Sequence, residues 1–170
     1  MTKDNSETSI HPQTQIGHIH LTVADLERSL AFYRDLLGFE VTMRYGDSAV
    51  FLSAGGYHHH IGLNTWAGEG ASPPPPGHTG LYHFAILYPH RRELAKALKR
   101  LLEAHYPLQG TSDHGVSEAI YLADPDGNGV ELYADRLSEA WPRNAEGELK
   151  MGRRALDVSG LLAELEPEAR

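Results

Sequence analysis

The sequence predicts an α+β protein in which two tandem βαβββ modules curl into one open-sided mixed β-barrel with flanking helices. Two observations carry this prediction. Strand-like and helix-like hydrophobic patterns follow one another in the same order twice along the chain. In addition, residues 16–19 match residues 81–84, and residues 61–63 match residues 130–132. A repeated unit that cannot bury its own sheet face alone implies that two such units pair around a pseudo-twofold axis.

The first module is expected over residues 16–66, after an N-terminal arm at 1–15 that we expect to be disordered or extended. Its first strand is predicted at residues 16–23, where side chains alternate between two faces. His18 and His20 then share one face of that strand. This places two imidazoles side by side at the start of the module.

A helix is predicted directly after this strand. Asp25 is suited to cap its first turn, and Gly38 can end it in the left-handed conformation. The apolar stripe of the helix comprises Leu26, Leu30, Tyr33 and Leu37. Three strand candidates separated by glycine-containing turns follow at residues 39–44, 49–53 and 58–64.

A linker is expected at residues 67–79, because the four consecutive prolines 73–76 cannot enter a sheet ladder or a helix interior. The second module is expected over residues 80–135, and residues 124–127 (Asp-Pro-Asp-Gly) form its tight turn. Its helix is predicted at 91–104, with Leu94, Ala97, Leu98 and Leu101 on one face. Its strands are predicted at 81–87, 108–112, 119–123 and 129–134.

A C-terminal tail is expected at residues 136–170 and contains the pattern of a short amphipathic helix. Its apolar positions are Leu156, Val158, Leu161, Leu162 and Leu165. This face either packs on its own barrel or reaches across to a partner subunit. The spacing favours neither, because a helix pattern does not identify its target.

The composition excludes several classes of protein. The 170 residues suit one domain or two small units that share a core, and the net charge of −8 without a basic stripe argues against a nucleic-acid partner. The polar N-terminus has no signal-peptide core and no apolar run approaches a membrane span, so we expect a cytoplasmic protein with no membrane partner. With no cysteine and 11 histidines, a transition metal must be bound through imidazole and carboxylate.

The pseudo-twofold axis predicts a metal site. It relates His18 to His83 and Gly62 to Glu131, so two imidazoles and one carboxylate converge while the fourth position has no side chain. Coordination positions are then left open for water, substrate or dioxygen. This is the ligand set of non-heme Fe(II) oxygenases, so we favour Fe(II), with Mn(II), Ni(II) or Zn(II) as alternatives.

Two histidines of module one are candidate substrate contacts. His20 shares the face of His18 and is also the rival for the first ligand position; we prefer His18 because the repeat pairs it with His83. His60 alternates onto the side of Gly62. An exposed polar strand is an equal alternative for His60.

His114 and Tyr121 lie on or beside the strands that lead to Glu131. They are candidate acid and base groups near a bound phenol. The composition around His114 also suits an ordinary loop histidine. Tyr121 matches Phe51 in the repeat, so ordinary packing is its alternative.

These residues resemble the vicinal oxygen chelate superfamily, which includes glyoxalase I, fosfomycin-resistance proteins, bleomycin-resistance proteins and extradiol catechol dioxygenases. The resemblance covers residues 16–135 and implies that His18, His83 and Glu131 are the metal ligands. Glyoxalase I uses a fourth ligand at the position of Gly62. The residues that carry the resemblance are 16–26, 32–39 and 124–133.

Residues 58–66 and 113–119 are similar to the amino-terminal half of the bacterial catechol-2,3-dioxygenase branch. The resemblance implies a metal-dependent dioxygenase that acts on a catechol or related vicinal-oxygen aromatic. A lyase or transferase of the glyoxalase or fosfomycin-resistance kind, and a non-catalytic protein that binds a drug or metabolite, remain alternatives. A two-module cup leaves sheet edges and one side open, so we expect a homodimer.

Overall fold

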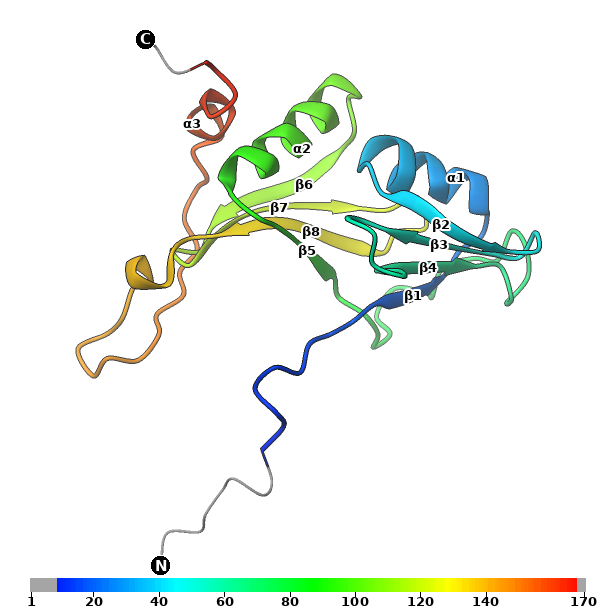
Figure 1. Ribbon diagram of the computed structural model, residues 1–170, viewed down its shortest axis with the longest axis horizontal. Helices are drawn as coiled ribbons and strands as arrows, with labels where there is room; N and C mark the ends of the chain where they lie inside the picture. The colour runs from blue at the N-terminus through cyan, green and yellow to red at the C-terminus, as the bar shows by residue number, and fades with distance from the viewer. Residues whose placement is uncertain (1–8, 168–170) are drawn as a thin grey trace, which may run out of the picture.

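The computed structural model describes residues 9–167 and contains two modules with the same order of elements (Figure 1). Module one consists of β1 (Ile19–Thr22), α1 (Leu26–Leu30), the π-helical segment η2 (Ala31–Leu36), β2 (Glu40–Tyr45), β3 (Ala49–Ser53) and β4 (Ile61–Asn64). Module two consists of β5 (Phe84–Tyr88), α2 (Arg91–Glu103), β6 (Leu108–Asp113), β7 (Ser117–Ala123) and β8 (Gly129–Asp135). The tail adds η3 (Ser138–Ala140) and α3 (Val158–Ala163). The predicted α+β class and the tandem βαβββ order are confirmed.

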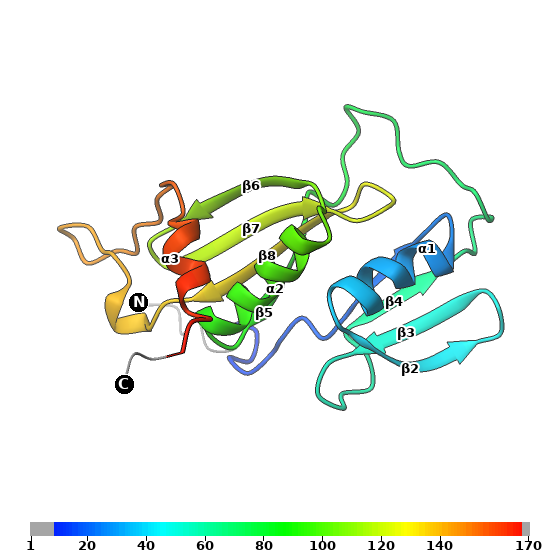
Figure 2. The ribbon, with the colours of Figure 1, turned by 90° about the horizontal axis from the view of Figure 1, so that it is seen from above.

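Each module forms its own four-stranded sheet, in the orders β1-β4-β3-β2 and β5-β8-β7-β6. The first strand of each module runs parallel to the last, and the other neighbours are antiparallel. Figure 2 shows the two sheets side by side. Within residues 9–167 no strand of one sheet pairs with a strand of the other, so the two sheets do not close into a barrel.

The strand registers support the predicted repeat. Ile19 pairs with Ile61 in module one, and Phe84 pairs with Val130 in module two. The residues just before β1 and β5, His18 and His83, are therefore equivalent. One step further along, His20 lies opposite Gly62 and Ala85 lies opposite Glu131.

The first helix has the predicted start and end. The Asp25 carboxylate accepts the backbone N–H of Arg28 at 2.8 Å, and Gly38 has a φ of +90°. After Leu30 the helix widens into π geometry, in which the N–H of Leu37 donates to the carbonyl of Phe32. An apolar stripe does not reveal this change of pitch. All four predicted stripe residues are buried: Leu26, Leu30, Tyr33 and Leu37.

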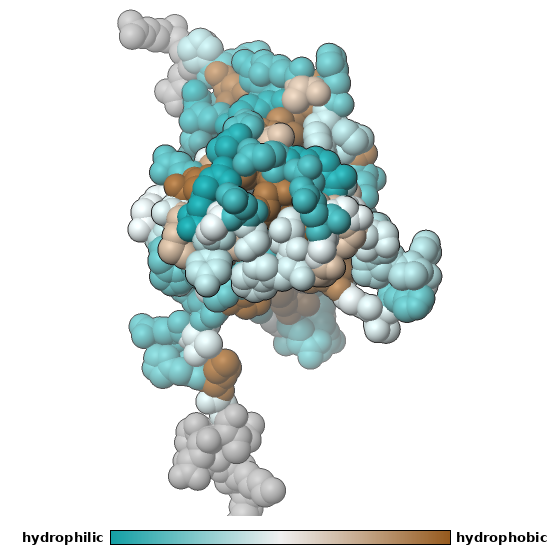
Figure 3. Space-filling view, turned by 90° about the vertical axis from the view of Figure 1, so that its right-hand side faces the viewer, coloured by the Kyte–Doolittle hydropathy of each residue, from teal (hydrophilic) through white to brown (hydrophobic). Residues whose placement is uncertain are grey.

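The helices α1 and α2 cover the same side of the two sheets (Figure 1). In β8, Val130, Leu132 and Ala134 are buried, whereas the alternating residues on the opposite face are only partly buried or exposed. Hydrophilic and weakly polar residues cover most of the module-one end, with apolar residues visible in patches between them (Figure 3). One face of β8 is thus left for side chains other than the core.

Polar contacts join module one to the β7–β8 turn of module two. The buried hydroxyl of Tyr33 donates to Asp124 at 2.7 Å, and the backbone N–H of Ala24 donates to Asp126 at 3.1 Å. Arg28 also forms an ion pair with Asp126. Burial and the neighbouring Asp124 carboxylate raise the pKa of Tyr33, which keeps this hydroxyl a donor.

The strands β1, β4 and β5 each begin three residues later than predicted. Backbone hydrogen bonding between strands starts only where the partner strand lies alongside. The segments before β1 and β5 are irregular, and His58, His59 and His60 lie in the β3–β4 loop rather than in a strand. Gly55 and Gly56 have φ values of +67° and +80° and widen that loop beyond a tight hairpin.

The predicted linker, residues 67–79, contains neither helix nor strand. The predicted arm lies partly outside the described residues, and residues 9–15 likewise contain neither.

The tail packs on module two of its own chain. In the contact between α3 and α2, Leu161 is fully buried, and Arg91 binds Glu164 at 2.6 Å. Backbone hydrogen bonds of 2.9 Å in both directions connect Asp113 to Arg154. Among the described residues, no helix is both long and apolar enough to cross a bilayer.

Candidate metal and substrate site

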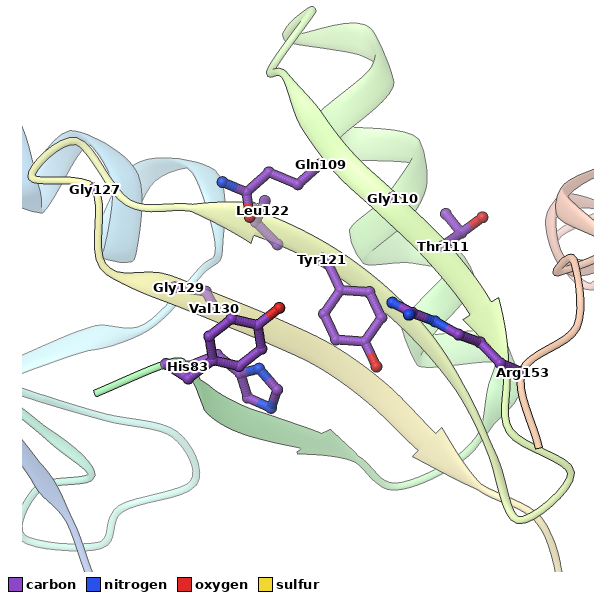
Figure 4. Close-up of a pocket in the computed structure, with 11 residues that line it drawn as sticks. His83, Gln109, Gly110, Thr111, Tyr121, Leu122, Gly127, Gly129, Val130 and Arg153 are labelled. Carbon is purple, nitrogen blue, oxygen red and sulfur yellow. The ribbon is translucent and has the colours of Figure 1, made fainter. Parts of the chain in front are cut away.

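A cavity of about 360 Å³ lies on the module-two sheet (Figure 4). Its size falls within the range of small-molecule pockets. Its walls come from the segment before β5, from β6, β7 and β8, and from the tail. The lining residues are Tyr82, His83, Gln109, Gly110, Thr111, Tyr121, Leu122, Gly127, Gly129, Val130 and Arg153.

Two of the three predicted metal ligands lie in contact, and one of them, His83, lines this cavity. His83 Nε2 lies 3.0 Å from Glu131 Oε2, and the side chains are 31% and 13% exposed. Two ligand atoms about 2.1 Å from one ion and at right angles to each other lie about 3 Å apart. The pair therefore fits two adjacent positions of a divalent metal that prefers nitrogen and oxygen ligands.

The other oxygen of Glu131 begins a hydrogen-bonded chain that includes both predicted acid–base residues. The Tyr121 hydroxyl is 3.0 Å from Glu131 Oε1 and 2.7 Å from His114 Nε2. His114 Nδ1 lies 2.8 Å from the carbonyl of Gly152, which can only accept, so Nδ1 carries a proton. The structure brings His114, Tyr121 and Glu131 together, and their acid–base role stays a prediction.

The hydrogen bonds that link Glu131, Tyr121 and His114 allow two arrangements of the protons. When His114 is neutral, its Nε2 is an acceptor, and the Tyr121 hydroxyl donates a hydrogen bond to it. When His114 is charged, Nε2 donates to the Tyr121 oxygen, and Tyr121 in turn donates to Glu131. A proton can thus be stored at His114 and passed on through Tyr121.

The electrostatics keep Tyr121 protonated. Burial, followed by the hydrogen bond to Glu131 and the charge of that carboxylate, raises the pKa of Tyr121 to about 12, and the opposing influence of Arg153 is smaller. At neutral pH the phenol is therefore a donor rather than an anion. This suits a residue that relays a proton.

The third predicted ligand lies elsewhere in the chain. The ring of His18 packs at 4.4 Å from the ring of His59 in module one. Among residues 9–167, no three His, Asp or Glu side chains are grouped closely enough to hold a metal ion. A single chain therefore brings together His83 and Glu131 but does not add His18 to them.

The predicted substrate contact His20 fills the space next to Gly62. A Cβ atom at position 62 would lie 2.9 Å from the His20 ring. The ring also packs against Trp66 at 5.3 Å and Phe51 at 5.6 Å. The position equivalent to Glu131 is thus kept free of a side chain by an imidazole.

His60 lies in module one and has local partners. Its Nδ1 accepts the backbone N–H of Ala54 at 3.3 Å and lies 3.0 Å from the Ser53 hydroxyl. In the same loop, His59 lies next to His18 and His58, and burial together with these neighbouring imidazoles lowers the pKa of His59. His60 is not among the residues that line the module-two cavity.

Sequence reasoning missed Arg153 as a pocket residue. Arg153 lies in the tail, outside the repeated modules, and reaches the cavity because the backbone of Arg154 pairs with Asp113. The repeat comparison has no counterpart for the tail. Only the charge of Arg153 was visible in the sequence, and nothing there connected it to β6.

Comparison of the sequence with known protein families shows which family this chain belongs to. Residues 15–132 match the Glyoxalase/Bleomycin resistance protein/Dioxygenase superfamily. The chain belongs to that superfamily. This confirms the vicinal oxygen chelate resemblance that the motifs predicted.

Individual relatives agree with this membership. The chain is 47% identical over 166 residues to a catechol-2,3-dioxygenase of Bacillus subtilis, covering 96% of this chain and 56% of that relative. It therefore spans just over half of that relative's length. A lactoylglutathione lyase from Agrobacterium tumefaciens has a similar structure (TM-score 0.56, 26% identity, 73% and 96% coverage). A glyoxalase/dioxygenase from Nostoc punctiforme has the same fold (TM-score 0.63, 21% identity, 76% and 97% coverage).

Proposed function

We propose that this protein is a metal-dependent dioxygenase that opens the ring of a catechol or a related aromatic with vicinal oxygens. The observation that carries the proposal is the His83–Glu131 pair at the cavity, joined to the Tyr121–His114 proton relay. The 47% identity to a catechol-2,3-dioxygenase supports the same chemistry. The cavity volume of about 360 Å³ accommodates one benzenoid ring.

In the proposed centre, His83 and Glu131 hold the metal and His18 from a second copy of the chain supplies the third ligand. The ligand set favours Fe(II), with Mn(II), Ni(II) and Zn(II) as alternatives. When bound, such a metal would supply the Lewis-acid and redox chemistry that a vicinal diol and dioxygen need to react. The separation of His18 from the other two ligands within one chain supports a shared site in a dimer.

The remaining residues handle the substrate proton. A diol hydroxyl placed beside Tyr121 passes its proton to the phenol oxygen while the Tyr121 proton moves to His114 Nε2. The raised pKa of Tyr121 keeps this group neutral between turnovers. Glu131, shared between His83 and Tyr121, couples the relay to the metal ligands.

The proposal is tested by reconstituting the protein with Fe(II) under anaerobic conditions, adding a panel of catechols and then admitting air. We expect oxygen uptake in step with the appearance of the yellow ring-cleavage product. The His114→Ala variant should lose turnover while it keeps its metal. Absence of turnover on every catechol in the panel, with Fe(II) bound, would refute the dioxygenase.

Mixing two inactive variants tests the shared site. His18→Ala and Glu131→Ala chains each lack one ligand, yet a mixed dimer contains one site with all three. If the chains exchange, mixing should restore about a quarter of the sites, since half of randomly paired dimers are mixed and each has one intact site. A monomer in light scattering, or no recovery after confirmed exchange, would contradict the shared centre.

The similarity to a lactoylglutathione lyase structure supports a second candidate, a lyase or transferase that uses the same pocket. Such an enzyme needs no dioxygen and works with Ni(II), Zn(II) or Mn(II). Hemithioacetal and fosfomycin assays under anaerobic conditions separate it from the first candidate. A protein that only binds a drug or metabolite would retain its ligand after metal removal and give no product in either assay.

A further inference from the structure

We propose that Arg153 binds an anionic ring substituent, so that the preferred substrate is a catechol that carries a carboxylate. This inference rests on the proposed function and narrows its substrate class. It starts from the position of Arg153 in the wall of the module-two cavity. Figure 4 shows its side chain extending from the tail toward Tyr121.

The backbone on both sides of Arg153 is fixed to module two. The N–H of Gly152 donates to the carbonyl of His114 at 2.9 Å, and the carbonyl of Gly152 lies 2.8 Å from the His114 ring. On the other side, Arg154 pairs with Asp113 through its backbone and through its guanidinium at 3.3 Å. Arg153 is therefore held at the cavity rather than carried on a free tail.

The guanidinium of Arg153 has no partner among the described residues. Neighbouring arginines do: Arg136 binds Asp113 and Glu118, at 3.2 and 2.9 Å, and Arg154 binds Asp113. Arg153 makes no hydrogen bond or ion pair within residues 9–167, although it is close enough to Tyr121 to affect its pKa. Its donors are thus free to bind a ligand.

The chemistry of the wall fits a carboxylate. Arg153 is the one permanent cation among the lining residues, and Gln109 and Thr111 add hydrogen-bonding groups from β6. A guanidinium binds a carboxylate through two parallel hydrogen bonds. The competing anion of the site, Glu131, is already engaged by His83 and Tyr121.

The cavity places this cation on the far side of Tyr121 from His83. The rings of Tyr121 and His83 are 5.8 Å apart, and Figure 4 shows Tyr121 between His83 and Arg153. A ring with its diol toward His83 would present a substituent on its opposite side to Arg153. A carboxylate at the carbon para to one hydroxyl matches this arrangement.

Calorimetry on the full metal-loaded chain under anaerobic conditions tests the inference, with 3,4-dihydroxybenzoate and catechol as the two probes. Arg153→Ala should weaken 3,4-dihydroxybenzoate binding about tenfold, or about 1.4 kcal/mol, and change catechol binding less than twofold. Arg153→Lys should fall between, because it keeps the charge without the paired donors. Lys150→Ala is the matched control, since it removes one exposed tail cation away from the cavity and should leave both probes unaffected.

The possible results separate this inference from the proposed function. Equal changes for both probes, no change in the arginine variants, or failure of the wild-type chain to bind either probe would overturn the role of Arg153. Turnover of catechol without preference for the carboxylate would overturn it while leaving the dioxygenase intact. An Arg153-dependent preference in a protein that never consumes oxygen would support it and refute the dioxygenase.

Discussion

The two modules have the same order of helices and strands, but they place their large and charged side chains on different strands of the parallel pair. In module one the parallel strand pair places the large ring of His20 opposite Gly62. In module two the equivalent pair places small Ala85 opposite Glu131. A small residue opposite position 131 is compatible with a side chain there, whereas the His20 ring crowds position 62.

This exchange of large and small residues places the cavity chemistry on one module. Module two combines the carboxylate with Tyr121, His114 and a cavity. Module one instead has histidine and aromatic rings packed against one another, including His18 with His59 and His20 with Trp66. The two copies of the duplicated scaffold therefore differ: one carries the carboxylate and the cavity, and the other carries packed rings.

The largest difference between the modules should appear in metal binding. His83→Ala removes a proposed ligand, so we expect metal affinity to fall by more than about 100-fold, beyond the 10- to 100-fold that loss of a ligand's outer partners costs. His20→Ala should change it by no more than a few-fold. Competition with a fluorescent chelator measures both variants. If the His20 change strips the metal and the His83 change does not, the ligand assignment is wrong.

The next largest effect should come from the glycine that starts β8. A Cβ added at Gly129 would lie 2.2 Å from the carbonyl oxygen of Tyr82, a backbone atom that cannot move aside cheaply. We expect Gly129→Ala to lower the free energy of unfolding by about 3 kcal/mol. Denaturant titration measures it, with Gly110→Ala as the control because an added Cβ there meets nothing within 4 Å. Equal stability of the two variants would show that β5 and β8 are not packed this closely.

Gly62 offers a milder version of the same test. Its added Cβ would meet the His20 side chain at 2.9 Å, and this ring can turn away where a backbone cannot. We expect Gly62→Ala to cost about 1–2 kcal/mol. In the His20→Ala background this cost should nearly disappear, which a double-mutant cycle of unfolding free energies measures as coupling of about 1 kcal/mol. Additive effects would show that His20 does not restrict position 62.

The sequence predicted the elements whose signals are local. Asp25 and Gly38 limit the first helix because capping and left-handed backbone depend on single residue types. The 124–127 turn is present for the same reason. The strand that was predicted to include His58 begins only at Ile61, because ladder pairing depends on partners distant in the chain.

The candidate site was predictable only as far as the repeat reaches. The repeat aligned His83 with His18 and Glu131 with Gly62, as the strand registers do. It could not show which parts of the chain pack together. His18 consequently lies with His59 rather than with Glu131. Arg153 was missed because a strand-like contact between the tail and Asp113 is a property of the fold, not of any periodic pattern.

The smallest expected effect concerns Asp113, which ties the tail to module two and has no counterpart in module one. Burial opposes its ionisation, but the Gly115 N–H and the guanidinium groups of Arg136 and Arg154 outweigh burial and hold the pKa of Asp113 below its usual value. A lowered folded-state pKa stabilises the fold above the unfolded-state pKa of about 3.9, and this stability is lost as the pH falls through the folded-state value.

Asp113→Asn should therefore cost about 1 kcal/mol at pH 7, and the difference from wild type should shrink as the pH drops below about 4. Unfolding free energies measured from pH 7 to pH 3 test this. Asp47→Asn, in the β2–β3 turn of module one, is the matched control, because Asp47 makes no ion pair in the described structure and its loss should leave the stability unchanged. If Asp113→Asn and Asp47→Asn have the same pH profile, the arginine pairs of Asp113 contribute nothing, and the tail is held by its backbone hydrogen bonds, the Arg91–Glu164 pair and the burial of Leu161.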